Sequence, residues 1–183
     1  NLGSAISFED DGPSMTVSAS AAADTLTVDE SSLVTNASAN FADNFTITSS
    51  YGADGAGTTV TTYALAVNSG STGLVDTATN QAVVLSVNGS GVVEGRTATS
   101  NALVFTVSVD TAGEVTLNQE RAVVHANSAN PDDGKGLAGA DLITLTRSDT
   151  ITDKDGDSIT DSGTINLGSA ISFEDDGPSM TVS

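Results

Sequence analysis

The stretch LVFTVSVD, at residues 103–110, is the clearest indication of the fold. Leu103, Phe105, Val107 and Val109 share one face of an extended strand, while Thr106 and Ser108 lie on the other. Similar runs rich in Thr, Val, Ile, Leu and Phe recur along the chain, separated by Gly, Asn, Asp and Ser, as is typical of short antiparallel strands. The expected strands cover residues 14–18, 25–28, 45–49, 60–67, 82–87, 103–109, 115–118, 122–125, 142–147, 149–152, 158–165 and 170–173.

No segment carries apolar residues at a sustained helical spacing. Residues 31–40 and 74–80 are expected to form single turns at most. The sequence therefore predicts an all-β domain, an antiparallel β-sandwich of the Ig-like or Greek-key type.

The first eighteen residues, NLGSAISFEDDGPSMTVS, return without change at residues 166–183, an offset of 165. An identity of this length indicates one period of a tandem array, with the junction between units present at both ends. Gly and Pro in EDDGP mark a boundary, because proline cannot donate to a strand ladder. We expect residues 1–13 to hold the last strand of a preceding unit and a linker. Residues 14–173 would form the sandwich, and residues 174–183 the next linker and the first strand of a following unit.

The net charge of −19 limits the partners of this chain. So acidic a protein repels phosphate backbones and anionic lipid, which argues against nucleic-acid or membrane-surface binding. No apolar run is long enough to span a bilayer, so no membrane insertion is expected. The chain has no cysteine, which excludes disulfides and thiolate metal sites. The mean hydropathy of +0.02 nevertheless indicates a chain that folds.

Fifteen of the 24 acidic residues fall in clusters, whereas a merely solubilising surface would spread its charge. Carboxylate oxygens in flexible loops, without His or Cys, are the ligands that calcium prefers. The sequence therefore predicts several calcium ions per unit, and divalent cations would take the place of disulfides as cross-links. The candidate ligands are Glu9, Asp10, Asp11, Asp29, Glu30, Asp153, Asp155, Asp157, Asp161, Glu174, Asp175 and Asp176. Asp132 and Asp133 are further candidates that ordinary turns explain equally well, and Asp54 is expected to be a turn residue.

The segment DTITDKDGDSITD, at residues 149–161, gives the most specific prediction. A two-residue turn at Asp155-Gly156 would put Ile151 and Ile159 on opposite faces, whereas a five-residue loop over 153–157 pairs them. The longer loop gathers three aspartates and leaves Gly156 free to take a positive φ. It also sets Asp149 opposite Asp161, a pair of like charges that needs a cation nearby. The alternative is a solvated acidic hairpin.

The linker acids Glu9, Asp10 and Asp11 repel one another between two rigid units. A calcium ion held by them and by neighbouring loops would turn a loose joint into a rigid strut. The alternative is a flexible charged linker.

Four segments resemble a known repeat family: LTVDES at 26–31, GVVEGRT at 91–97, DGDS at 155–158 and, above all, SFEDDGPS at 7–14. They are similar to the tandem extender repeats of giant calcium-dependent RTX-type adhesins, which Gram-negative bacteria export by type I secretion. The resemblance covers essentially the whole period. It implies a β-sandwich, calcium at the linkers and inside the domain, and an extracellular role in projecting adhesive domains from the cell during biofilm formation. The glycine-rich nonapeptide repeats and the C-terminal secretion signal of such proteins do not occur in this sequence.

Other functions find less support in the sequence. An enzyme is not expected, because His125 is the only histidine, no nucleophile elbow occurs, and the acids fall in turns and linkers. His125 is expected to be a strand-end residue without a chemical role. The rival is a ligand-binding adhesive module, for which Thr-x-Thr pairs such as Thr144/Thr146 and Thr150/Thr152 are the candidate surface. Few aromatic residues are available to stack on a sugar, and the expected partners are neighbouring repeats rather than a small-molecule substrate.

Overall fold

A computed structural model describes residues 9–21, 24–127 and 129–177 of the chain. These residues form β-strands joined by turns and three short 3-10 helices, and the predicted all-β class is confirmed. The strands are β1 Ser14–Ala19, β2 Leu26–Asp29, β3 Ala37–Asn40, β4 Phe45–Ser50, β5 Ala56–Val67, β6 Val83–Val87, β7 Val93–Thr97, β8 Leu103–Val109, β9 Glu114–Gln119, β10 Gly134–Gly136, β11 Ile143–Asp153, β12 Ser158–Asn166 and β13 Ile171–Glu174. The 3-10 helices are η2 Glu30–Ser32, η3 Ala42–Asn44 and η4 Gly168–Ala170.

Two sheets make up one half of the molecule. One sheet has the strand order β3-β9-β8-β7-β6, and the other has the order β10-β13-β2. Phe105 on β8 packs against Phe173 on β13 with ring centroids 5.1 Å apart, and both side chains are fully buried. Strands β13 and β2 pair in parallel, which departs from the expectation of antiparallel strands throughout.

The other half combines the sheet β12-β11-β5 with the two-stranded ribbon β1-β4. Gly163 on β12 faces Val17 of β1 and Phe45 of β4, and a methyl group added at this glycine would lie within 3.4 Å of both side chains. Leu145 of β11 pairs with Ile165 and Leu65 on its two neighbours, and all three side chains are buried. One continuous hydrophobic cluster runs through both halves, from Val17 to Phe173.

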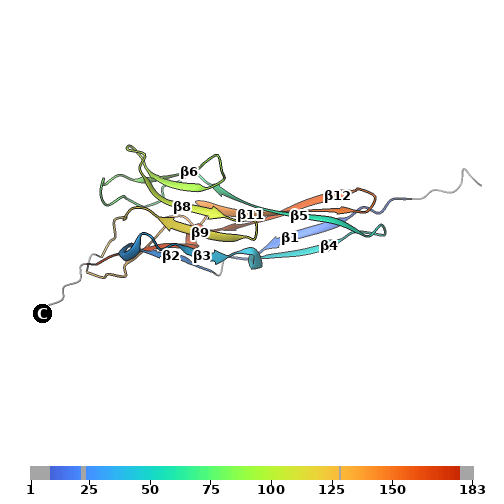
Figure 1. Ribbon diagram of the computed structural model, residues 1–183, viewed down its shortest axis with the longest axis horizontal. Coiled ribbons are helices and arrows are strands. Elements are labelled where there is room, and N and C mark those ends of the chain that lie inside the picture. The colour runs from blue at the N-terminus through green and yellow to red at the C-terminus, as the bar shows by residue number, and fades with distance from the viewer. Residues whose placement is uncertain (1–8, 22–23, 128, 178–183) are drawn as a thin grey trace, which may run out of the picture.

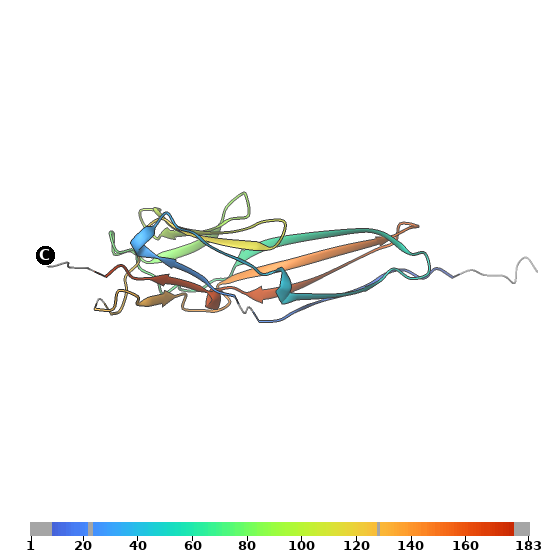
Figure 2. The same cartoon turned by 60° about the horizontal axis from the view of Figure 1, so that its bottom comes forward.

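The molecule is elongated, with the two halves arranged along its longest axis (Figure 1, Figure 2). The first described residues, before β1, lie at one end of this axis, beside the loop that joins β11 and β12. The last described residues, after β13, lie at the opposite end. A head-to-tail repeat of such a unit therefore extends in one direction. The predicted placement of residues 1–8 as a strand of a neighbouring unit lies outside the described residues.

Most predicted strands are present, with shifted ends. Residues 142–147 and 149–152 form the single strand β11. Phe105 and Val107 are buried as the alternation in LVFTVSVD predicts, but Val104 is buried too, since the register of β7 and β8 shifts between Gly95 and Arg96. The strand predicted over 122–125 is wrong, because only Val123 forms a bridge, to Asp76. Strands β3, β7 and β10 were not predicted.

Candidate metal centres

The loop between β11 and β12 has the predicted register. Ile151 pairs with Ile159 and Thr152 with Ser158, so residues 153–157 form the hairpin loop. Gly156 takes a φ of 109°. Ile151 is fully buried, whereas Ile159 is half-buried, so the pair enters the core on one side only. The five-residue loop, the register and the conformation of Gly156 are confirmed.

Asp153 is the buried carboxylate of this loop, with 4 % of its surface exposed. Its Oδ1 accepts hydrogen bonds from the backbone N–H groups of Gly156, at 3.0 Å, and Asp157, at 2.8 Å. Its Oδ2 is buried and, while the neighbouring carboxyl groups are ionised, has no hydrogen-bond partner among the described residues. A buried oxygen of a carboxylate without a partner is costly, and a cation beside it removes that cost.

Two overlapping sets of carboxylates meet at this end of the molecule. Asp153, Asp155 and Asp157 offer ligand atoms within 4.8 Å of one another, and so do Asp10, Asp54 and Asp155. We call these five residues the N-terminal group. They come from the linker before β1, the turn between β4 and β5, and the hairpin loop. Asp54, expected to be only a turn residue, is thus a member of the group, and Asp155 belongs to both sets.

The carboxylates of the N-terminal group shift one another's pKa values. Asp153, as hydrogen-bond partner and as negative charge, raises the pKa of Asp155 to about 6, and partial burial and the charges of Asp54 and Asp10 add to this effect. Asp10 raises the pKa of Asp157, while the hydrogen bond with Asp155 lowers that of Asp153. Without a cation, Asp155 therefore keeps its proton up to a higher pH than an isolated aspartate does.

The linker before β1 lies directly on these loops. Gly52, with a φ of 68°, faces the backbone oxygen of Asp11 so closely that a Cβ atom has no room. The Asp11 N–H donates to Oδ1 of Asp10 at 3.0 Å. These contacts place Asp10 beside Asp54 and Asp155.

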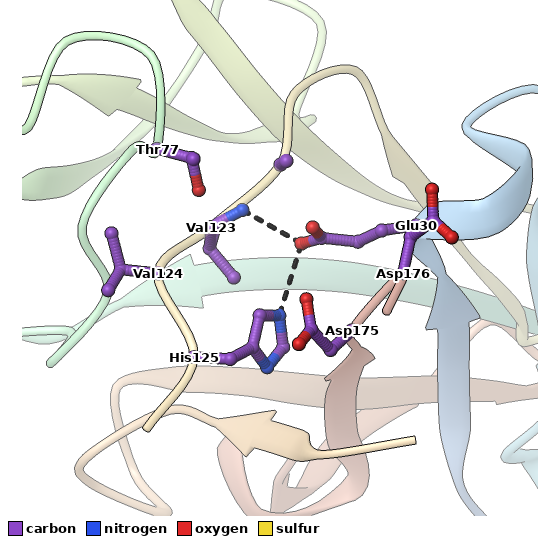
Figure 3. A pocket seen from close by; sticks show the side chains of 8 residues that line it. Glu30, Thr77, Val123, Val124, His125, Asp175 and Asp176 are labelled. Carbon is purple, nitrogen blue, oxygen red and sulfur yellow. Dashed lines mark hydrogen bonds and ion pairs between the residues drawn. The ribbon is translucent and has the colours of Figure 1, made fainter. Parts of the chain in front are cut away.

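A second group of possible ligands lies at the opposite end of the molecule, where the chain leaves β13 (Figure 1), and Figure 3 shows it from close by. Oε1 of Glu30, in η2, accepts hydrogen bonds from Nε2 of Gln119 and from the N–H of Val123, each at 2.8 Å, and lies 3.3 Å from Nε2 of His125. Asp175, in the linker after β13, completes a set whose ligand atoms lie within 4.8 Å of one another. We call Glu30, His125 and Asp175 the C-terminal group.

His125 differs from its predicted role as a residue at the end of a strand. Only 3 % of its side chain is exposed, and its ring lies beside both carboxylates of the C-terminal group (Figure 3). The segment that carries it is held by Asp133, whose Oδ2 accepts hydrogen bonds from the N–H groups of Ala126 and Asn127, each at 3.0 Å. The backbone oxygen of Asp133 accepts the N–H of Asp175 at 3.3 Å. Asp133 thus joins the histidine segment to the linker.

Comparison with known proteins places the chain in a family. Residues 25–168 match the family model described as "Domain of unknown function (DUF5801)". The chain belongs to this family. No curated protein and no solved structure matches it. The matched region of the DUF5801 domain contains Glu30, Asp54, the hairpin loop and His125, while Asp10 and Asp175 lie in the linkers outside it. In the part of the domain that the structure describes, no helix is long and apolar enough to cross a membrane.

The remaining predicted ligands lie outside both groups. Asp161 accepts the N–H of Val17 at 2.8 Å and so ties β12 to β1. Asp161 pairs with Asp149 on β11, which carries the same charge. The charge of Asp149 is neutralised by Arg147, whose Nε lies 2.7 Å from Oδ2 of Asp149. Burial raises the pKa of Asp149, but the hydrogen bonds from Arg147 and Thr61 outweigh it, and the net shift is downward. The cation expected near this pair is therefore present as the guanidinium of Arg147, and the pair gives no support to a calcium ion here.

Asp29 caps η2 by accepting the N–H of Ser31 at 2.8 Å. Glu174 lies in β13, and Glu9, Asp11 and Asp132 are exposed. Asp176 lines the pocket beside Glu30 and His125 without belonging to the group. Of the predicted ligands, the structure thus brings together Asp10, Asp153, Asp155 and Asp157 at one end, and Glu30 and Asp175 at the other.

The raised pKa of Asp155 predicts how pH acts on the metal-free domain. A carboxyl group that binds its proton more tightly when folded than when unfolded contributes stability at low pH. That stability is lost as the pH rises from about 4 through about 6. We therefore expect metal-stripped protein to melt at a higher temperature at pH 5 than at pH 7.5. The pKa values of Asp76 and Asp149 are lowered, so the protonation of these two groups changes the stability only at a pH below this interval.

Differential scanning fluorimetry in metal-free buffer measures this difference, with Asp155→Asn as the control variant. The variant should remove most of the dependence on pH. An unaltered dependence in Asp155→Asn would show that another group is responsible.

Proposed function

We propose that this chain is a calcium-rigidified extender repeat of a bacterial cell-surface adhesin, a spacer that projects adhesive domains for attachment or biofilm formation. The observation that carries the proposal is the N-terminal group: carboxylates from three separate segments form two sets that share Asp155, and one set includes Asp153, whose buried Oδ2 has no hydrogen-bond partner among the described residues. All of its ligands are carboxylate oxygens, on loops or, for Asp153, at the end of β11, and calcium prefers such oxygen donors. An ion held there cross-links the linker, the β4–β5 turn and the hairpin loop.

The repeated sequence extends this proposal from one unit to an array. Because residues 166–183 repeat residues 1–18, Asp175 is the counterpart of Asp10. In an array, the linker that leaves one unit beside Glu30 and His125 enters the next beside Asp54 and Asp155. A single linker aspartate then contacts both neighbours, and an ion bound to it fixes the angle between them.

The shape of the molecule supports a spacer. The described chain ends lie at opposite ends of the longest axis, so each added unit increases reach (Figure 1). The resemblance to extender repeats of RTX-type adhesins implies export by type I secretion to the surface of a Gram-negative bacterium. Such a spacer acts through length and stiffness, and the proposal assigns it no catalytic role.

Titration of metal-stripped protein with calcium in a calorimeter tests the ion site. We expect dissociation constants in the range of about 10⁻⁴–10⁻³ M that is usual for extracellular modules. Asp155→Asn should weaken binding most, because Asp155 belongs to both sets of the N-terminal group. Asp43→Asn, at an exposed aspartate outside both groups, is the matched control. Equal binding by the two variants would place the calcium elsewhere.

Gly52→Ala tests the role of the linker without removing a carboxylate. A Cβ at this position displaces the backbone of Asp11 and with it Asp10, so calcium affinity should fall by about tenfold, as when a supporting contact of a metal site is lost. Gly91 also has a positive φ, 79°, but faces open space, so Gly91→Ala has the same backbone strain without the displacement. Similar affinities in both variants would exclude the linker from the site.

One observation favours the alternative, a ligand-binding adhesive module. The outer face of the sheet β12-β11-β5 carries no charged residue. Its exposed or half-exposed positions are Thr58, Val60, Thr62, Ala64, Ala66, Thr144, Thr146, Ser148, Thr150, Thr152, Ser158, Thr160, Ser162 and Thr164. Several hydroxyls pair across strands, such as Thr146 with Thr164 at 2.8 Å and Thr150 with Thr160 at 2.7 Å. A glycan array separates the two functions: a spacer binds no glycan, whereas an adhesive module does so through this face.

A further inference from the structure

The C-terminal group has a different chemistry from the N-terminal group. It combines one imidazole with the two carboxylates of Glu30 and Asp175, and their ligand atoms lie within 4.8 Å of one another. The three side chains line a pocket of about 340 Å³, together with Thr77, Val123 and Asp176. Figure 3 shows the imidazole of His125 next to both carboxylates.

Polar atoms of this site lack partners. Nδ1 of His125 is buried and has no hydrogen-bond partner among the described residues, on a side chain that is 3 % exposed. Gln119, which donates to Glu30, has its Oε1 buried without a partner as well. The nitrogen beside Glu30 is Nε2, at 3.3 Å, and because no described residue partners Nδ1, nothing fixes the tautomer of the ring, so Nδ1 can carry the proton while Nε2 offers its lone pair to a metal.

The charge of the group also indicates a cation. In the described part of the chain, Glu30 forms an ion pair with His125 and with no lysine or arginine. Two carboxylates on a protein of net charge −19 therefore have oxygens within 4.8 Å of each other. A divalent ion balances both carboxylates.

We propose that Glu30, His125 and Asp175 bind a divalent transition-metal ion such as Zn²⁺ or Co²⁺ at the C-terminal end of the unit. An imidazole with two carboxylates is a donor set for such ions, whereas calcium takes oxygen ligands only. Three protein ligands and a water molecule in the pocket give the four-coordinate geometry that zinc prefers. In this chain the site shares no residue with the proposed calcium site, lies at the other end of the unit and takes a different class of metal; in an array the two sites would adjoin at the linker, where Asp175 of one unit is the counterpart of Asp10 in the next.

Cobalt absorption tests the site directly. Metal-stripped protein is titrated with Co²⁺ in the presence of about 10 mM CaCl₂. This concentration exceeds the dissociation constants of about 10⁻⁴–10⁻³ M that are usual for extracellular calcium sites, so the calcium sites are filled. We expect one Co²⁺ per chain, with visible bands typical of tetrahedral or five-coordinate cobalt, and displacement by Zn²⁺. Asp175→Asn, in the linker, should weaken cobalt binding at least about tenfold with little effect on folding, and so should His125→Gln.

Asp155→Asn is the matched control, a carboxylate lost at the other end of the molecule. Cobalt binding should be unchanged in this variant, although calcium binding falls. The proposal is overturned if cobalt leaves no visible bands, if calcium displaces it as readily as zinc does, or if Asp155→Asn weakens it as much as Asp175→Asn. Circular dichroism melts of each variant separate lost ligands from lost folding.

Discussion

Calcium at about 1–10 mM should raise the melting temperature of this chain by about 3–12 °C for each site that it fills, relative to protein in EGTA. At a dissociation constant of ~10⁻⁴ M, these concentrations stabilise the folded state by about 1.5–3 kcal/mol per site. In a domain of this size, each kcal/mol raises the melting temperature by about 2–4 °C. The proposed ion would neutralise Asp155 and its neighbours, and it would remove the cost of the buried, unpartnered Oδ2 of Asp153 if it binds there.

Magnesium is the control for this melt. It requires a small octahedral shell and gives up its water reluctantly, so flexible aspartate loops bind it more weakly than calcium. We expect a clearly smaller shift with magnesium, and a smaller calcium shift in the variant Asp153→Asn. Equal melting temperatures in EGTA, magnesium and calcium would mean that no divalent ion stabilises the domain.

Asp76→Ala should lower the free energy of unfolding by about 2–3 kcal/mol, because it removes a buried carboxylate that accepts hydrogen bonds from Arg121 and Thr79. Asp76 is fully buried and accepts hydrogen bonds from Nε of Arg121 at 2.7 Å and from the N–H and hydroxyl of Thr79 at 2.8 and 2.6 Å. The hydrogen bond from Arg121 is the main reason why its pKa is lowered to about 2. Its backbone also bridges Val123, so this residue supports the segment that carries His125.

Urea denaturation measures the loss, and Glu94→Ala is the matched control. Glu94 forms an ion pair of the same length with Arg96, 2.7 Å, but its side chain is 17 % exposed, whereas that of Asp76 is not exposed at all. A carboxylate in contact with water regains much of its solvation when the pair is lost, so Glu94→Ala should lower the stability less than Asp76→Ala. If both variants lose the same stability, the burial of Asp76 does not determine the effect.

The fold could be predicted from the sequence wherever β-branched and aromatic residues mark the strands. The missed strands lack this signal: β3 reads ASAN and is held by pairing with β9, and β10 is the short edge GKG beside β13. In β7, Gly95 interrupts the pattern because the ring of Phe105 occupies the space where its Cβ would lie. These three segments are strands because they pair and pack with neighbouring strands, and a single sequence does not reveal which strands become neighbours.

The candidate sites divide in the same way. The hairpin loop could be predicted, because Ile151 and Ile159 must share a face and the register follows from that requirement. The presence of Asp10 and Asp54 beside this loop could not be predicted, because three segments far apart in the sequence meet there. His125 was missed for the same reason, because its partner Glu30 lies 95 residues away. The clustering of acids indicated both ends of the unit, but not which members of each cluster meet.

The central claim is that calcium stiffens the joint between consecutive units. Small-angle X-ray scattering of a chain with two consecutive 165-residue periods tests it most directly, in calcium and in EGTA, with Asp155→Asn in the second unit as a control. We predict a rod with a larger maximum dimension in calcium, and a shorter, broader distribution of distances in EGTA and in the variant. The same maximum dimension with and without calcium, in a chain that is folded in both conditions, would contradict the claim.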